Sequence, residues 1–111
     1  MNDYELAKLI REAMELHEEK TKNNKYILKP ETAVKISRIL QLTSESCVKA
    51  KFDISDNAFD IELQSYVFDS PTEHMKEVFE LADIFNIDAL DDGMVSIELR
   101  ILEAGILISE N

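Results

Sequence analysis

The sequence VKAKFDISDNAFDIELQ, residues 48–64, decides the fold because its apolar residues alternate with polar ones along two successive runs. A period of two is typical of a strand that buries one face. Between the runs lies Asp56-Asn57, a pair that suits the positive φ angles of a two-residue turn. The stretch therefore predicts an antiparallel β-hairpin with one apolar and one polar face.

A two-residue turn also predicts the register of this hairpin, because the turn length determines which residues face each other. The expected pairs on the apolar face are Ile54 with Phe59, Phe52 with Ile61, and Ala50 with Leu63. On the polar face, Lys51 is expected opposite Glu62, and Asp53 opposite Asp60.

Three segments outside the hairpin show the spacing of amphipathic helices. The first covers residues 3–22, with Asn2 or Asp3 as its cap and Asn23-Asn24 at its end. The second opens at Lys29-Pro30-Glu31 and runs to about Leu42, with proline in the first turn. A third helix is predicted from the capping sequence Ser70-Pro71-Thr72-Glu73 to about Asn86.

The remaining segments predict further strands. Residues 95–101 alternate after the turn sequence Asp91-Asp92-Gly93, and short apolar runs cover 26–28 and 106–108. We expect a single α+β domain over residues 1–111: a two-layer sandwich with an antiparallel sheet and helices on one face. From residue 26 onward the order is that of a ferredoxin-like β-α-β-β-α-β fold, preceded by an extra N-terminal helix.

The composition indicates a cytoplasmic protein. No apolar run approaches the roughly 20 residues needed to span a bilayer, and the first residues, MNDYELAKL, lack the layout of a secretory signal. Cys47 is the only cysteine, so no internal disulfide is expected. We expect no membrane association.

Charge is divided unevenly along the chain, whose formal net charge is −11. Residues 20–51 hold eight bases and two acids, whereas residues 52–111 hold two bases and fifteen acids. Such asymmetry favours a partner with a basic surface and disfavours direct nucleic-acid binding, because acids repel phosphates. Two alternative explanations of the same charges are attraction between the two halves of the molecule and solubility.

The sequence contains no pattern typical of catalysis, cofactor binding or metal binding. It has two histidines, one cysteine and no glycine-flanked serine, and its two glycines are too far apart for a phosphate loop. His17 and His74 have no second zinc ligand at helical spacing, and the acids near the hairpin turn lack the spacing of a calcium loop. We therefore expect a non-enzymatic protein with no cofactor and no metal.

The candidate partner-binding residues come from the acidic half. Stepping 100° per residue along the third predicted helix places an isoleucine among outward-facing carboxylates, an acidic face with an apolar anchor. We add two acids from the polar face of the sheet. The candidate residues are Glu73, Glu77, Glu80, Asp83, Ile84, Asp60 and Glu62.

Three functional hypotheses follow. The first is a protein-binding or regulatory domain that docks on a basic surface of another macromolecule. The second is an inhibitor or immunity protein that mimics the charge of nucleic acid, which the basic residues 20–51 argue against. The third is a dimeric domain that binds a small molecule or effector between helices and sheet, with the homodimer formed through the C-terminal strand.

Overall fold

The hairpin predicted from residues 48–64 is present in the structure. Strand β2 (Lys49–Ser55) pairs with β3 (Ala58–Ser65) in the expected register, including Ile54 opposite Phe59 and Asp53 opposite Asp60. The turn residues Asp56 and Asn57 have φ angles of 50° and 63°. Two successive positive φ angles match a type I′ turn, whose twist suits the flanking strands.

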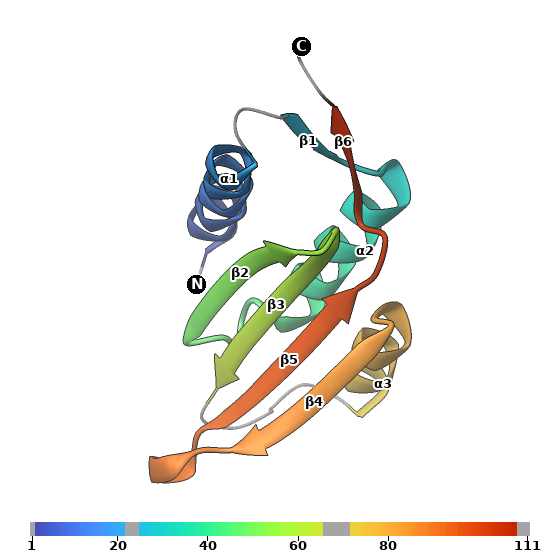
Figure 1. Cartoon of the computed structure of the whole chain (residues 1–111). Helices are drawn as coiled ribbons and strands as arrows, with labels where there is room; N and C mark the ends of the chain where they lie inside the picture. The colour runs from blue at the N-terminus through green and yellow to red at the C-terminus, as the bar shows by residue number, and fades with distance from the viewer. Residues whose placement is uncertain (1, 22–24, 66–71, 109–111) are drawn as a thin grey trace.

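The computed structural model describes residues 2–21, 25–65 and 72–108 (Figure 1). In chain order, the elements around the hairpin are α1 (Asp3–Lys20), β1 (Lys25–Leu28), α2 (Pro30–Thr43), α3 (Thr72–Leu81), β4 (Ile84–Ala89), the 3-10 turn η1 (Asp91–Gly93), β5 (Val95–Ile101) and β6 (Gly105–Ile108).

The main sheet has four antiparallel strands in the order β2-β3-β5-β4. One face of this sheet is apolar, and Figure 1 shows α2 and α3 behind it and α1 beside β2. All three helices contribute buried residues to a single core with the apolar face of the sheet. From the sheet, this core takes Phe52, Ile54, Phe59, Ile61, Leu63, Ile97, Leu99 and Ile101.

The expected α+β class is confirmed: the described residues form three α-helices and two antiparallel sheets, consistent with a two-layer sandwich. The strand order differs from the ferredoxin-like variant, in which the first strand joins the main sheet. Here β1 pairs with β6 in a separate two-stranded ribbon instead.

The prediction of a helix as far as Asn86 was wrong. Helix α3 ends at Leu81, and the chain then forms β4, which pairs with β5 along its whole length. Phe85, Ile87 and Ala89 alternate with Asn86 and Asp88, so the segment also has the period of a strand. Pairing with β5 decides between the two patterns. The predicted cap at Ser70-Pro71 lies outside the described residues.

Helix α1 begins as expected, because the Asn2 side chain accepts a hydrogen bond of 2.8 Å from the Glu5 N–H. It ends at Lys20, two residues before the predicted end. The expected terminal pair Asn23-Asn24 lies outside the described residues.

The β1–β6 ribbon extends from the body of the molecule (Figure 1). The principal extents of the molecule, with the ribbon, are 48 × 25 × 24 Å. The two strands of the ribbon approach each other closely at Gly105, where an added Cβ would lie 2.8 Å from the Ile27 carbonyl oxygen and against the Tyr26 ring. Glycine is therefore required for this approach. On the outer surface, Ile27 and Ile106 face each other and both remain exposed.

We expect Ile61→Ala to lower the free energy of unfolding by about 2–5 kcal/mol, because the cavity would form in the centre of the sheet. Ile61 is 1% exposed. The matched control Ile106→Ala, at a position 53% exposed, is expected to change stability by about 0.5 kcal/mol or less. Urea denaturation of both variants checks this. Equal losses in both variants would contradict the placement of the core.

Candidate functional site

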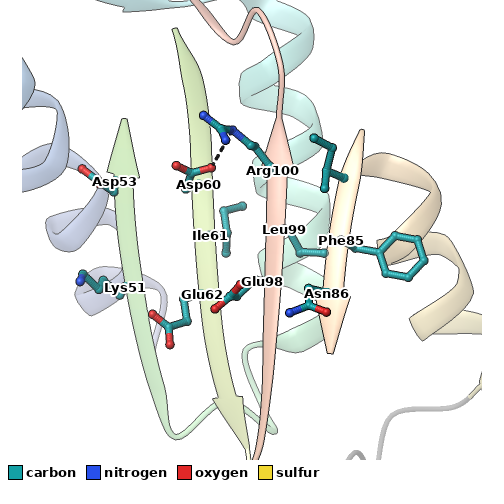
Figure 2. A pocket seen from close by; sticks show the side chains of 11 residues that line it. Lys51, Asp53, Asp60, Ile61, Glu62, Phe85, Asn86, Glu98, Leu99 and Arg100 are labelled. Atoms are coloured by element: carbon teal, nitrogen blue, oxygen red, sulfur yellow. Dashed lines mark ion pairs between the residues drawn. The ribbon is translucent and has the colours of Figure 1, made fainter. Parts of the chain in front are cut away.

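The face of the main sheet that points away from the helices is polar and forms an open groove of about 410 Å³. No described element packs across it, and Figure 2 shows its side chains as seen from that side. Charged side chains dominate the lining, with four carboxylates and two cations. The lining side chains on this face are Lys51, Asp53, Asp60, Glu62, Ile84, Asn86, Glu98 and Arg100.

At one end of the groove, Arg100 holds Asp60 in a small polar network. The Arg100 Nε lies 3.3 Å from Asp60 Oδ1 (Figure 2). The Arg100 Nη2 donates a hydrogen bond to Ser55 Oγ at 3.2 Å. The Ser55 hydroxyl in turn donates to Asp60 Oδ2 at 3.3 Å. Asp60 is therefore a partly neutralised carboxylate.

The pKa of Asp60 is nevertheless raised from its ordinary value. Burial of the carboxyl is the largest cause, and the nearby Asp53 carboxylate raises the pKa further. The charge of Arg100 and the hydrogen bond from Ser55 lower it, without cancelling the effect of burial. At this end of the groove Asp60 is therefore paired with Arg100 of the same chain, and the exposed Asp53 lies opposite Asp60.

The other end of the groove is different, because two carboxylates face each other there (Figure 2). Glu62 of β3 lies directly opposite Glu98 of the neighbouring strand β5 (Figure 2). Neither forms an ion pair with another described residue; Glu62 only accepts a hydrogen bond of 3.4 Å from the Gln64 amide. Like charges directly opposite each other destabilise a sheet. A bound cation would relieve this repulsion.

Strand β4 adds an apolar side chain to the same surface. Ile84 lies opposite Arg100 in the β4–β5 register, so it is on the polar face, and it is half exposed. Asn86, two residues further along β4, lies opposite Glu98. The groove therefore combines free carboxylates, an amide and an exposed apolar residue.

The structure divides the predicted site residues between two layers. It brings Asp60, Glu62 and Ile84 together on the open face. Placing Ile84 on the third helix was wrong, because it is the first residue of β4. Asp83 precedes it, and its Oδ2 accepts a hydrogen bond of 2.8 Å from the Leu102 N–H. The remaining three, Glu73, Glu77 and Glu80, are on α3, in the helical layer.

Glu77 is committed to a contact inside the molecule. It forms a two-pronged ion pair with Arg38 of α2, in which the Arg38 Nη2 donates to Glu77 Oε1 at 3.0 Å and the Nε donates to Oε2. The hydrogen bonds from Arg38 lower the pKa of Glu77. The outward acidic face predicted for this helix is therefore reduced to Glu73 and Glu80.

Glu98 and Asn86 were not among the site residues predicted from the sequence. The alternation over residues 95–101 does place Glu98 on the polar face of its strand. What the sequence lacks is a signal that β5 lies next to β3, because the two strands are separated by a helix and another strand.

The other residues singled out from the sequence have structural roles. His17 lies in the last turn of α1 and packs edge-on against Tyr26, with the ring centroids 5.0 Å apart. Cys47 is buried, and burial raises the pKa of its thiol. Among the described residues, no group of three or more His, Cys, Asp or Glu side chains is arranged to hold a metal ion.

A second groove, of about 690 Å³, lies between α1 and α2. Its lining is mostly apolar and includes the half-buried residues Ile10 and Leu40. Exposed alanines, Ala7 and Ala33, contribute from the two helices.

Comparisons with protein families, with curated proteins and with solved structures gave no match to this chain. Within the described residues, the helices are too short or too polar for any of them to cross a membrane.

We expect Arg38→Gln to raise the pKa of Glu77 back toward the ordinary value for glutamate, because the hydrogen bonds and charge that lower it are removed. NMR titration of the side-chain carboxyl carbons checks this. Arg100→Gln, which removes the other arginine in an ion pair, is the control and should leave Glu77 unchanged. A Glu77 pKa that does not respond to Arg38→Gln would contradict the pairing.

Proposed function

We propose that this chain is a non-enzymatic, protein-binding domain that receives a basic segment of a partner protein on the open face of its main sheet. The observation that carries the proposal is the pair Glu62 and Glu98, which face each other on the two central strands with no ion pair among the described residues. A lysine or arginine placed between them would turn repulsion into attraction.

The surroundings of this pair support a peptide or protein rather than a small ion. The groove is open and extends across all four strands of the main sheet, and the half-exposed Ile84 offers apolar contact beside the charges. Interfaces commonly combine an apolar anchor with charges that determine orientation and rate of association. We further propose a reducing, cytosolic setting, which the single buried cysteine supports.

Regulation of the partner by occlusion is the simplest consequence of such binding. The structure gives the nucleic-acid mimic less support, because Asp60 and Glu77 are paired with arginines of the same chain. An extended row of free carboxylates, as a mimic requires, is interrupted at both positions.

We expect the double charge reversal Glu62→Lys with Glu98→Lys to weaken binding of a lysine- and leucine-containing peptide by about tenfold or more at low salt. The matched control is Glu73→Lys with Glu80→Lys, which changes the net charge equally on α3. Fluorescence anisotropy in a salt series measures both, and wild-type binding should weaken as salt rises.

Two outcomes would contradict the proposal. One is equal loss of binding in the sheet and helix variants, which would indicate that only net charge matters. The other is binding of the glutamate counterpart of the peptide as strongly as the lysine form.

The apolar groove between α1 and α2 favours a second candidate function, the binding of a small apolar effector. Pockets for small molecules are mostly apolar and commonly lie between helices. We expect Ala33→Trp to fill this groove and to abolish the fluorescence enhancement of an anilinonaphthalene probe. Val34→Trp, at the neighbouring position on α2, is 68% exposed in the wild type and serves as the control. Equal enhancement in both variants would remove this candidate.

A further inference from the structure

The outer edge of β4 is exposed and apolar. Three of its six residues are large apolar side chains that remain about half exposed: Ile84 and Phe85 at 52%, and Ile87 at 50%. Asp88 is the only charged residue in the strand. On its outer side, β4 pairs with no other described strand.

The opposite edge of the same sheet is built differently. Strand β2 carries Lys49, Lys51 and Asp53, and α1 packs beside it (Figure 1). Charges and covering helices are the usual protection of an edge strand against pairing with another chain. Strand β4 carries a single charge, Asp88, and all six of its residues are exposed, so it can accept another strand.

The apolar layer of the molecule continues to this edge and stops there. Phe85 and Ile87 lie opposite the buried residues Leu99 and Ile97 of β5. Phe85 also packs against Phe79 of α3, with the ring centroids 4.5 Å apart. Phe85 and Ile87 are therefore the place where the core is open to solvent.

A second copy of β4 is complementary to the first. In an antiparallel pairing about a two-fold axis through Ile87, each Phe85 lies opposite Ala89 of the partner subunit on the helical side. On the polar side, each Asn86 lies opposite Asp88 of the partner subunit, so an amide meets a carboxylate and the two Asp88 side chains do not face each other. Asn86 Nδ2 already donates to Asp88 Oδ2 of its own strand at 3.1 Å.

We propose that β4 is a self-association edge, through which two copies of this chain pair antiparallel to form a continuous eight-stranded sheet. The pairing is isologous and apolar in its centre, whereas each whole chain carries a net charge of −11. A dimer formed in this way is therefore opposed by charge repulsion and strengthened by salt. The two polar grooves would then lie on one face of the joint sheet.

The interface is small, because a six-residue strand buries less than the about 1,600 Å² of a standard protein–protein interface. We therefore expect reversible, concentration-dependent association. Sedimentation velocity of the full chain should show a mass that rises from 12.7 kDa toward twice that value with concentration, and more readily at high salt.

The deciding variant is Ile87→Lys, which places a charge at the proposed two-fold axis and should leave the chain monomeric at every concentration. Val34→Lys on α2 is the control for an exposed apolar residue and should still associate. Ile106→Lys tests the alternative, a dimer through β6, and should also leave association unchanged. Far-UV circular dichroism verifies that each variant is folded.

A wild-type chain that stays monomeric from micromolar to millimolar concentration at high salt would overturn the proposal. Dissociation by Ile106→Lys in place of Ile87→Lys would overturn it as well.

If Ile87→Lys does not fold, hydrogen exchange of the wild type tests the proposal instead. The β4 amides that point away from β5 should gain protection with rising concentration, and unchanged protection of these amides overturns the proposal. The salt response separates this proposal from the peptide-binding one, because peptide binding weakens with salt.

Discussion

The pairing of β2 with β3 through the turn at Asp56-Asn57 determines what the rest of the molecule can do. Because side chains alternate along a strand, a slip of one residue would move Phe59 to the solvent and Asp60 into the core. Phe59 is completely buried and Ile61 nearly so, which makes such a slip very costly. The same register that buries these residues presents Glu62 on the open face, so core and candidate site depend on one turn.

Local patterns account for the parts of the fold that were predicted. The hairpin register, the cap at Asn2 and the α+β class each follow from residues close together in the chain. Strand β4 was missed because Phe79, Ala82 and Phe85 also have helical spacing, and only pairing with β5 decides between helix and strand. The separate β1–β6 ribbon likewise depends on a contact between segments near opposite ends of the sequence.

The candidate site shows the same difference between what local patterns predict and what contacts between distant segments decide. Asp60 and Glu62 were placed correctly on the polar face, because alternation alone determines the face of a strand. Ile84 was expected beside carboxylates on a helix, and strand pairing places it opposite Arg100 of β5 instead. Glu77 was expected to face solvent, and α2 supplies Arg38 to it. Contacts between elements distant in sequence decide both cases.

The ribbon has a consequence for how the chain folds as it is made. Lys25 of β1 pairs with Ile108 of β6, so this contact closes a loop that runs from residue 25 to residue 108. Contacts of such long range form slowly, and during synthesis β1 has no partner strand until β6 has left the ribosome. Until then Tyr26, which the finished structure buries, remains accessible. The segment Lys25–Leu28 therefore stays without its partner strand for as long as the residues up to β6 are being synthesised.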